Sequence, residues 1–494
     1  ERGAEIFIGH ASEQLRTARP DLVVYSSAIR ADNPELAVAE QQGLSVVRRA
    51  VLLAALTHRR RSICIAGMHG KTTTTALLAH ALETLGTEPG FAVGAFAPQL
   101  GRHARGGAEG SFFVVETDES DGTLREFQPH QSIVLNIDEE HLDFYANFEA
   151  VCDEFSTFAA QTSDTVFFCA DDLRLAELYD AQTTAITFGF DSTADYRAEI
   201  QPDHSFVVWN GEAHLGKFTI RLYGEKNISN ALAVIAFLHH NGFAAEKICE
   251  AVADFRGAER RQQEIFCDDR FRVFDDYGHH PREITSTLRA IKEQCGGRLV
   301  VAFQPHRYSR TQHLLSEFAE SFGDADLLWV TEVYAASETP IADVNGQRLA
   351  AAISNQGQPA VYVESLEVLR KQVCAALQPG DVVVFLGAGD ITRVAHEVAG
   401  DLNLNMKGRT HPEALRAQLS EASRVAENEP LSKRTTLGVG GPAEIFIEPS
   451  SEADLAQALR YCTANRLPVF VLGRGSNLLI RDGGIRGGVV SLQH

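Results

Sequence analysis

The chain has 494 residues with a formal net charge of −21, so a general nucleic-acid or membrane-surface binder is disfavoured and an anionic ligand would need local basic groups. Its eight cysteines are scattered without a C-x-x-C pair, which argues against a zinc site or a disulfide framework and favours a reducing, cytoplasmic location. There is no signal peptide and no run of about 18 apolar residues, so no membrane span is expected.

Short apolar runs alternate with helical stretches along most of the chain. Strands are expected at "DLVVYSSAI", "RSICIAG", "SFFVVETD", "SIVLNI", "TVFFCA" and "RLVVAFQP", with helices at 72–85 and 313–322. Buried apolar strands that are separated by helices predict parallel sheets and an α/β fold class. The expected divisions are a first domain at 1–57, a second at 58–262, a third at 263–400, a polar, partly helical connector at 401–430 and a different unit at 431–494.

The stretch "IAGMHGKTTTT", residues 65–75, is expected to form a phosphate-binding turn between a strand and a helix. It is shorter than the usual G-x-x-x-x-G-K-[ST] loop, because its glycines are Gly67 and Gly70. Glycines let backbone N–H groups curl around phosphate oxygens, and the helix N-terminus adds a partial positive charge. Lys71 can reach the terminal phosphates and Thr72 offers a hydroxyl to Mg²⁺. A plain glycine turn before an ordinary helix is the alternative.

Polar residues follow two further expected strands of the same sheet. Glu116 comes directly after the strand in "FFVVETDESDGT", and His141 follows the strand in "IVLNIDEEHLDFY". Ligands of open α/β sheets bind beyond the carboxyl ends of the strands, and a Mg²⁺-bound triphosphate requires hard ligands. Each segment alone could be an ordinary solvated loop, but together with the phosphate loop they favour a metal site.

Eight motifs in the first 400 residues resemble those of the Mur ligases in kind and in order. They are "GMHGKTTTT", "ETDESDGT", "NIDEEHLDFY", "GEKNISNALA", "DDYGHHP", "FQPHRYSRT", "EVYAASETPI" and "GAGDI". The resemblance is closest to the branch of the family that joins L-alanine to UDP-N-acetylmuramate in peptidoglycan synthesis. It implies Rossmann-like first and third domains on either side of a central P-loop ATPase domain. It also implies an ATP- and Mg²⁺-dependent ligase that forms an acyl phosphate, because an amine cannot attack a free carboxylate at neutral pH.

The resemblance carries site residues over position by position. For ATP it implies Gly67, His69, Gly70, Lys71, Thr72, Thr73, Asn227 and Asn230. For Mg²⁺ it implies Thr72, Glu116 and His141. For the sugar and the amino acid it implies Ser26, Ser27, Arg261, Tyr277, His279, His306, Arg307 and Arg310. The catalytic set is Lys71, Glu116, His141, His279, Arg307 and Arg310.

Some of these assignments leave a choice open. Arg260 is as good a candidate as Arg261 at the border of the second and third domains. The family often has His-Asn where this chain has Lys226 and Asn227, so the contact to the adenine base is open. His279 is the candidate that accepts or orients the proton of the attacking amine.

Residues 1–57 resemble only the second half of the family's UDP-sugar-binding domain. The strand and Gly-rich turn that open that domain do not precede "GAEIFIGH". Two alternatives therefore stand beside a working L-alanine ligase. One is a truncated fragment that binds ATP without turnover, and the other is a ligase that attaches a recycled peptide or a later amino acid.

The last segment resembles the start of the FAD-binding domain of UDP-N-acetylenolpyruvoylglucosamine reductases, a partial α+β domain. The resemblance rests on "TTLGVGGPAEIFIEP" and "GRGSNLLIRDGG", where Arg474 stands in place of a more usual glycine. It implies FAD contacts at Gly440, Gly441, Gly473, Gly475, Ser476 and Asn477. The parent protein is thus expected to be a ligase–reductase fusion. FAD and NADPH are expected to serve only the full-length reductase part.

Overall fold

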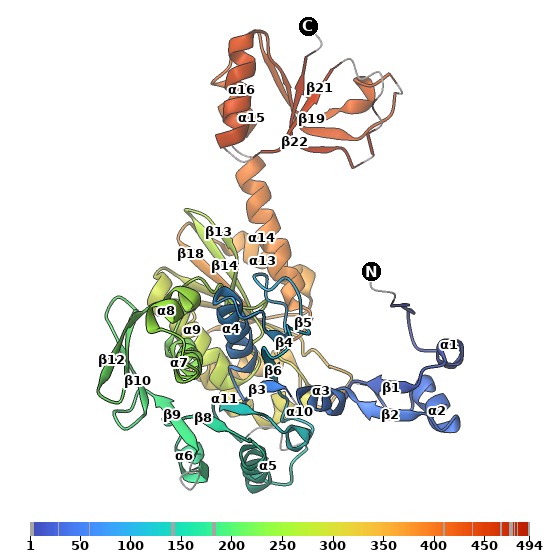
Figure 1. Cartoon of the computed structure of the whole chain (residues 1–494). Helices are drawn as coiled ribbons and strands as arrows, with labels where there is room; N and C mark the ends of the chain where they lie inside the picture. The colour runs from blue at the N-terminus through green and yellow to red at the C-terminus, as the bar shows by residue number, and fades with distance from the viewer. Residues whose placement is uncertain are drawn as a thin grey trace. The chain divides into compact units, whose positions relative to one another are not determined.

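The structure is a computed structural model of the whole chain. It describes all residues except 1–3, 28, 59, 140–143, 180–183, 409–410, 437, 465–466, 474–477, 479, 482 and 493–494. The chain forms two compact units, Glu1–Ala395 and His396–His494, and Figure 1 follows their elements in chain order. Each unit is described by itself.

The first 57 residues form a small parallel pair of strands with three helices. The strands β1 (Leu22–Tyr25) and β2 (Ser45–Arg48) pair in parallel. The helices are α1 (Ser12–Ala18), α2 (Pro34–Gln41) and α3 (Arg49–Thr57). Helix α2 begins at Pro34, where the Asn33 side chain accepts hydrogen bonds from the N–H groups of Glu35 and Leu36 and proline occupies the first helical position.

A ten-stranded sheet forms the centre of the first unit. Its strands, from edge to edge, are β12 (Ala213–Phe218), β11 (Phe206–Asn210), β10 (Tyr196–Ile200), β9 (Ala185–Gly189), β8 (Thr165–Cys169), β7 (Gln131–Val134), β3 (Arg61–Ala66), β6 (Phe112–Glu116), β4 (Gly90–Ala92) and β5 (Ala104–Arg105). The helices of this part are α4 (Lys71–Thr84), α5 (Phe148–Ala160), α6 (Leu173–Tyr179), α7 (Glu225–His240) and α8 (Ala245–Ala253), with a 3₁₀ turn at Leu124–Glu126.

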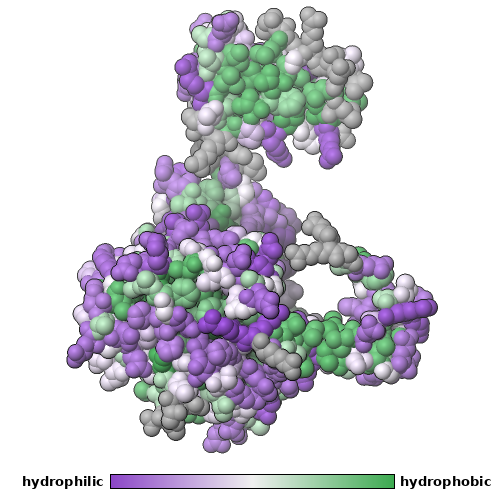
Figure 2. All heavy atoms as spheres, in the orientation of Figure 1, coloured by the Kyte–Doolittle hydropathy of each residue, from purple (hydrophilic) through white to green (hydrophobic). Residues whose placement is uncertain are grey.

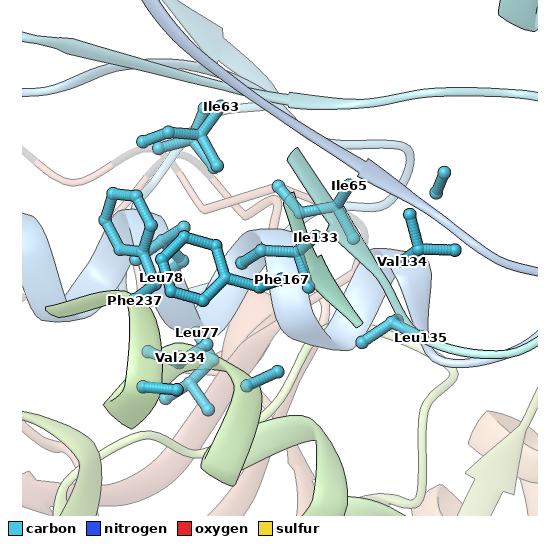
Figure 3. Close-up of a cluster of buried hydrophobic side chains, with 14 of the residues drawn as sticks. Ile63, Ile65, Leu77, Leu78, Ile133, Val134, Leu135, Phe167, Val234 and Phe237 are labelled. Carbon is cyan, nitrogen blue, oxygen red and sulfur yellow. The ribbon is translucent and has the colours of Figure 1, made fainter. Parts of the chain in front are cut away.

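The strands from β4 to β10 in this sheet run parallel, and helices cover them. Strand β3 is buried along almost its whole length, which explains its continuous apolar sequence. Figure 3 shows Ile63 and Ile65 of β3 packed with Leu77 of α4 and Val234 and Phe237 of α7. The phosphate loop therefore follows directly on a buried strand in the interior of this sheet.

A second, six-stranded sheet follows in the first unit. Its order is β13 (Gln263–Cys267), β14 (Phe271–Asp276), β18 (Asp381–Leu386), β15 (Leu299–Phe303), β16 (Leu327–Thr331) and β17 (Ala360–Val363), and all neighbours except β13 and β14 are parallel. Its helices are α9 (Pro281–Cys295), α10 (Tyr308–His313), α11 (Leu315–Glu320), α12 (Gly346–Asn355), α13 (Leu366–Ala376) and α14 (Ile391–Gly408). These parallel sheets confirm the predicted α/β class.

The expected single helix at 313–322 is wrong in its bounds. The chain forms two short helices there, α10 and α11, which meet at Leu314. Leu314 has a backbone conformation outside the regular helical region (φ −105°, ψ 23°), and it closes one helix and opens the next. The spacing of apolar residues does not reveal such a break, because the helical period of these residues is nearly the same on both sides of it.

The second unit contains a four-stranded sheet. Its order is β19 (Arg424–Pro430), β20 (Pro442–Glu448), β22 (Ile485–Ser491) and β21 (Val469–Leu472), with helices α15 (His411–Arg416) and α16 (Glu452–Ala464) and a 3₁₀ turn at Leu431–Lys433. Strand β19 pairs antiparallel with β20 and buries Val425. The connector expected at 401–430 therefore ends in a strand of this sheet, although its polar sequence indicated a linker.

Candidate active site

The phosphate loop lies at the carboxyl end of β3, between the ends of β6 and β7. Gly67 (φ +139°) and Gly70 (φ +86°) have left-handed backbone conformations that favour glycine. A Cβ on Gly67 would lie 3.2 Å from the backbone N and O of Asn136, and one on Gly70 would overlap the Asn230 side chain. The loop is thus packed closely against Asn136 and Asn230.

Lys71 is held at the start of α4 by three oxygen atoms. Its Nζ donates to the carbonyl oxygen of Gly67 at 2.6 Å, to that of Met68 at 3.3 Å and to Glu119 Oε1 at 2.8 Å. Burial tends to lower the pKa of Lys71, but the Glu119 carboxylate outweighs it and the pKa is raised. The ammonium group is therefore charged and folded back on its own loop, within reach of a phosphate bound there.

Thr72 and Glu116 meet beside this lysine. Thr72 Oγ1 donates to Glu116 Oε1 at 2.7 Å, and the backbone N–H of Gly94 donates to Glu116 Oε2 at 2.7 Å. A hydroxyl and an oriented carboxylate at a phosphate loop are the hard oxygen ligands that suit Mg²⁺. The third predicted ligand, His141, lies outside the described residues. Within the described residues, no group of three or more His, Cys, Asp or Glu side chains is arranged to hold a metal.

Asn136 fixes the position of His69 in the phosphate loop. Its Oδ1 accepts from the His69 backbone N–H at 2.8 Å, and its Nδ2 donates to the His69 carbonyl at 3.0 Å. Sequence reasoning did not single out Asn136. The available signal was its place directly after the strand in "SIVLN", where sheet ligands usually lie.

Asn227 and Asn230 lie together on the first turns of α7. Asn227 Nδ2 donates to the Tyr223 carbonyl at 2.8 Å and to Gln262 Oε1 at 3.1 Å, and Asn230 Nδ2 donates to Asn227 Oδ1 at 3.3 Å. A small pocket of about 70 Å³ lies beside them. Its lining also includes His69, Gly70, Thr73, Lys226, Arg261, Asp276 and Glu283. The predicted adenine side therefore adjoins the phosphate loop.

A larger cavity of about 870 Å³ connects the phosphate loop with the third domain. Lys71, Thr72 and Glu116 line one part of it, and Arg261 and Tyr277 line another. Leucines 52, 53 and 56 of α3 also line the cavity, and Figure 2 shows apolar side chains gathered over this helix. Its lining therefore offers cationic, acidic and apolar side chains to one ligand.

The two arginines at the domain border have different contacts. Arg260 donates to the carbonyl oxygens of Gly387 and Gly389, the latter at 3.1 Å. Both guanidinium groups lie over the Tyr277 ring, at 4.9 Å for Arg260 and 5.1 Å for Arg261. Arg261 also lines the small pocket beside Asn227, whereas Arg260 does not. Both arginines line the large cavity, so both adjoin a ligand there, but only Arg261 also reaches the small pocket and only Arg260 holds the Gly387 and Gly389 carbonyls.

His279 is a partly buried, neutral imidazole. Its Nδ1 lies 3.0 Å from the Tyr277 carbonyl oxygen, so Nδ1 carries the proton and Nε2 carries the lone pair. Burial lowers the pKa of His279 to about 4, with the Arg310 charge adding to the effect and Glu283 opposing it. A neutral imidazole with an available Nε2 lone pair can accept a proton from an amine.

His306, Arg307 and Arg310 lie on one loop and the first turn of α10, as the spacing predicts. The His306 ring stacks on Tyr334 with a centroid distance of 5.6 Å, and its Nδ1 accepts from Arg310 Nη1 at 3.4 Å. The Arg307 backbone has φ +69° and its N–H donates to the Tyr334 carbonyl at 2.8 Å. His306 is also 5.7 Å from the His279 ring, which brings the two predicted amino-acid segments together.

The two serines predicted for the sugar nucleotide lie in the loop after β1. Ser26 is half-buried and its carbonyl accepts from the Ile29 N–H, while Ser27 is exposed. In the described part of the chain, the large cavity reaches Arg49 on α3 but is not lined by either serine. Nearby, Arg48 Nη1 donates to the Asp121 carbonyl at 3.0 Å, a link from the first domain to the acidic loop that the sequence did not reveal.

Only part of the predicted FAD loop is described. Gly440 (φ +139°) packs against Ile480, where a Cβ would lie 3.0 Å from that side chain's own Cβ. Gly441 donates its N–H to the Arg481 carbonyl. Gly473 follows β21. The remaining predicted contacts, Gly475, Ser476 and Asn477, lie outside the described residues.

Family models match most of the chain in order. The Mur ligase family catalytic domain matches residues 1–61, the Mur ligase middle domain 65–238 and the Mur ligase glutamate ligase domain 259–389. An FAD binding domain matches residues 443–494. Among the described residues, no helix combines the length and the apolar composition that crossing a membrane would take.

Curated relatives and solved structures match the same region. The chain is 40% identical over 403 residues to UDP-N-acetylmuramate–L-alanine ligase of Gloeobacter violaceus, covering 80% of this chain and 86% of that protein. It is 40% identical to the enzyme of the same name from Myxococcus xanthus, covering 80% and 85%. The structure of UDP-N-acetylmuramate-alanine ligase from Thermotoga maritima has a TM-score of 0.70 and 29% identity, covering 82% of this chain and 89% of that one. A murein peptide ligase from Psychrobacter arcticus shares the fold, with a TM-score of 0.58, 24% identity and coverage of 82% and 89%.

Proposed function

This chain belongs to the Mur ligase family, and on that premise we propose that it joins L-alanine to UDP-N-acetylmuramate with ATP as the phosphoryl donor. The observation that carries the proposal is the placement of Lys71, Thr72 and Glu116 in one cavity with Arg261 and Tyr277. The phosphate-binding loop and the amino-acid site must face each other if the same carboxyl group is to be phosphorylated and then joined to an amine.

In the first step, a carboxylate oxygen of UDP-N-acetylmuramate attacks the γ-phosphorus of ATP. The bond between that phosphorus and the β–γ bridging oxygen breaks, and ADP leaves. Lys71 and the N–H groups of the loop hold the phosphate oxygens and neutralise their charge. The loop requires glycine at 67 and 70, since a Cβ at either position would meet Leu135, Asn136 or Asn230.

In the second step, the amine of L-alanine attacks the carbonyl carbon of the acyl phosphate. The carbon–oxygen bond to phosphate breaks, and an amide and inorganic phosphate result. His279 Nε2 accepts the proton that the amine loses, because its Nδ1 is already committed to the Tyr277 carbonyl. Arg307 and Arg310 supply positive charge for the carboxylate of the amino acid or for the acyl phosphate.

Mg²⁺ would be held by Thr72 and Glu116, with His141 as a further predicted ligand. The 2.7 Å contact between Thr72 Oγ1 and Glu116 Oε1 puts two oxygen donors at one point of the loop, which fits this ion. When bound, Mg²⁺ neutralises phosphate charge during phosphoryl transfer.

The last 64 residues are proposed to belong to a flavin-dependent reductase that is fused to the ligase. The match of an FAD binding domain to residues 443–494 supports this part of the proposal. FAD and NADPH would serve that reductase and not the ligase reaction. We propose a cytoplasmic location, where ATP is available and cysteines stay reduced.

A ligation assay tests the proposal and its alternatives. Purified protein with Mg²⁺, ATP and UDP-N-acetylmuramate should release ADP and phosphate when L-alanine is added, and the product mass should rise by one alanyl residue. If ADP is released only with a tripeptide or with diaminopimelate in place of L-alanine, the result would favour a peptide-recycling ligase or a ligase that adds a later amino acid. ATP binding without release in any of these mixtures would favour a fragment that does not turn over.

A further inference from the structure

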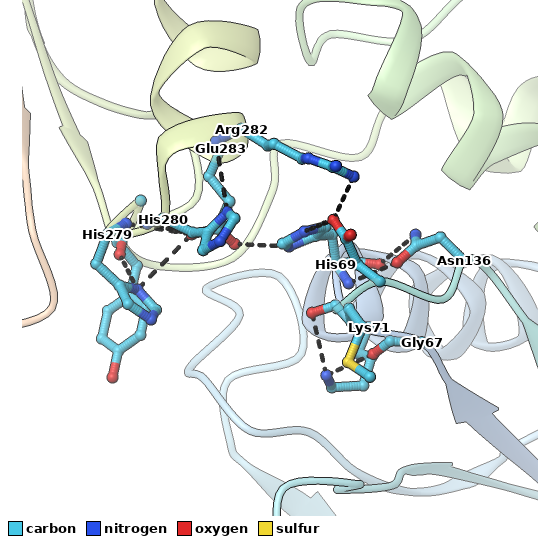
Figure 4. Close-up of polar contacts among 12 residues, drawn as sticks. Gly67, His69, Lys71, Asn136, His279, His280, Arg282 and Glu283 are labelled. Carbon is cyan, nitrogen blue, oxygen red and sulfur yellow. Dashed lines mark hydrogen bonds and ion pairs between the residues drawn. The ribbon is translucent and has the colours of Figure 1, made fainter. Parts of the chain in front are cut away.

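One carboxylate joins the phosphate loop to the amino-acid loop. Glu283, in the first turn of α9, has Oε1 at 3.3 Å from His69 Nδ1. Its Oε2 accepts from the backbone N–H groups of His279 at 3.1 Å and His280 at 3.3 Å. Figure 4 shows this carboxylate between the two segments. The two oxygens of a single side chain thus contact both the predicted ATP-binding loop and the predicted amino-acid-binding loop.

The phosphate-loop end of this link is fixed in the central domain. Asn136 holds both backbone groups of His69 and so ties this residue of the loop to the end of β7. A second contact runs in parallel, because Arg282 Nη1 donates to Asp138 Oδ2 at 2.6 Å. Asp138 follows the same strand as Asn136, and Arg282 precedes Glu283 on α9.

The amino-acid end is fixed as firmly. The backbone N–H of His279 bonds to Glu283, and its ring bonds to the Tyr277 carbonyl. A displacement of the Glu283 carboxylate therefore pulls on the backbone of the residue whose Nε2 is proposed to take the amine proton. A single side chain, that of Glu283, links His69 to the backbone of His279.

Charge makes the link costly to break. The side chain of Glu283 is only 15% exposed and that of His69 only 8%. Burial opposes charge on Glu283, but the hydrogen bond and charge of His69 and the charge of Arg261 keep its pKa well below the usual value. Burial likewise opposes charge on His69, but Asp138 and Glu283 outweigh it and its pKa is raised. An ionised carboxylate and a protonated imidazole form a charge-assisted bond, and removing either partner takes away part of the support for the buried charge of the other.

We propose that Glu283 is a positioning residue that couples occupancy of the phosphate loop to the placement of His279. The inference rests on the proposed function, which assigns ATP to the first loop and the amino acid to the second. Nucleotide at Gly67–Thr72 fixes His69, His69 fixes the Glu283 carboxylate, and the carboxylate fixes the loop from Tyr277 to His280. Because coupling is reciprocal, an occupied amino-acid site also stabilises the nucleotide-bound loop.

Glu283 also completes a capping box at the start of α9, where it accepts from the His280 N–H. A capping role alone would stabilise the helix to the same extent with and without nucleotide. The test must therefore measure a change that nucleotide causes, and not the stability of α9.

Hydrogen exchange on the full chain measures that change. Amide exchange at 66–75 and at 277–284 is compared with and without Mg²⁺ and a non-hydrolysable ATP analogue, in the wild type, E283Q and H69Q. The matched control is E293Q, since Glu293 lies on the same helix in an exposed pair with Arg289 at 3.8 Å. H69Q leaves the capping box of α9 intact and so tests the same link if E283Q folds poorly.

In the wild type and E293Q, the analogue should slow exchange in both segments. In E283Q it should still slow exchange at 66–75, while the nucleotide-dependent slowing at 277–284 should fall by about tenfold. H69Q is compared at a saturating concentration of the analogue, because His69 belongs to the predicted ATP site, and the same fall at 277–284 is expected there. Equal slowing at 277–284 in E283Q, H69Q and E293Q would overturn the inference, because a capping role would then suffice. If the analogue protects 66–75 in no variant, including the wild type, the proposed function falls and the inference falls with it.

The kinetic counterpart uses the ligation assay. With UDP-N-acetylmuramate saturating, E283Q should raise the KM for L-alanine by about tenfold relative to E293Q and change the KM for ATP much less. A KM for L-alanine that is the same in E283Q and E293Q, in a wild-type enzyme that forms product, would overturn the inference while the proposed function stands.

Discussion

At the scale of single residues, the site is organised by side chains that hold other side chains. Glu119 keeps Lys71 against its own loop, Gly94 orients Glu116, and Asn136 holds His69. None of these three partners was singled out from the sequence. Their effect is to fix, before any ligand arrives, the groups that the proposed chemistry requires, which lowers the cost of ordering them later.

Replacing Lys71 with alanine should abolish ADP release in the ligation assay, with a fall in kcat of at least about 10²-fold, as is typical when one preorganised charge donor is lost. The buried Glu119 carboxylate would also lose its 2.8 Å partner. K247A is the matched control, because Lys247 forms an exposed pair with Glu250 far from the loop in sequence. Normal turnover in K71A would contradict the assignment of the phosphate site.

His279 should make unfolding free energy depend on pH. Its folded pKa of about 4 lies below its ordinary value of 6.5, so the unfolded chain binds more protons between these values. Stability is thus present above pH 6.5 and lost as the pH falls towards 4. H279Q should flatten the curve in this window by up to about 1.4 kcal/mol per pH unit.

Denaturant titrations at a series of pH values measure this slope for both proteins. The comparison must be made between variant and wild type, because burial raises the pKa of Asp276 to about 6 and its titration opposes that of His279 in part of the window. Identical slopes would show that His279 is not buried in its neutral form.

At the scale of elements, the ends of three adjacent strands build the nucleotide side. Strand β3 leads into the phosphate loop, β6 ends at Glu116, and β7 is followed by Asn136 and Asp138. Because parallel strands present their carboxyl ends at one edge, residues far apart in sequence meet there. Helix α9, which packs against the six-stranded sheet, places Glu283 beside His69 of the phosphate loop. The strand order alone would not predict this contact.

The junction of β3 and α4 should tolerate no side chain at Gly70. G70A adds a Cβ that overlaps Asn230 and forces a residue with φ +86°, so the KM for ATP should rise by at least about tenfold. G86A is the matched control at the other end of α4. Gly86 has φ +78° with no atom within 4 Å of an added Cβ, so G86A should cost only the left-handed backbone penalty, about 1–2 kcal/mol.

Nucleotide titration and thermal unfolding of both variants separate the two effects. Equal loss of ATP affinity in G70A and G86A would mean that backbone strain, and not the contact with Asn230, limits the loop.

At the scale of the whole molecule, the chain divides at Ala395 and His396 into two compact units. The first contains the two parallel sheets, both pockets of the candidate site and the contacts between the second and third domains. The second has its own core, with Val425, Ile447 and Val490 buried together. We propose that ligase chemistry needs only the first unit.

A protein that ends after Gly408, and so keeps α14 whole, should retain the ligation rate of the full chain. Its thermal unfolding should lack the transition that comes from the second unit, since that unit has a separate core. Assay and calorimetry of the two proteins side by side make the check. A large loss of ligation rate on truncation would show that the second unit supports the first.

The sequence by itself determined the α/β class, the family and the order of the domains, because periodic apolar runs and the phosphate-loop motif are local patterns. It also singled out Lys71, Thr72 and Glu116, which belong to such motifs and line one cavity in the structure. Its helix at 313–322 and its connector up to 430 differ from the structure, because a break at Leu314 and the pairing of β19 leave weak local signals.

Only the tertiary structure decided which polar groups meet. Arg260 donates to the backbone carbonyls of Gly387 and Gly389, more than a hundred residues away in sequence. The contact of His69 with Glu283 spans 214 positions and two sheets. Such pairings are set by how sheets and helices pack, and the identity of a residue carries no record of the distant partner that packing will give it.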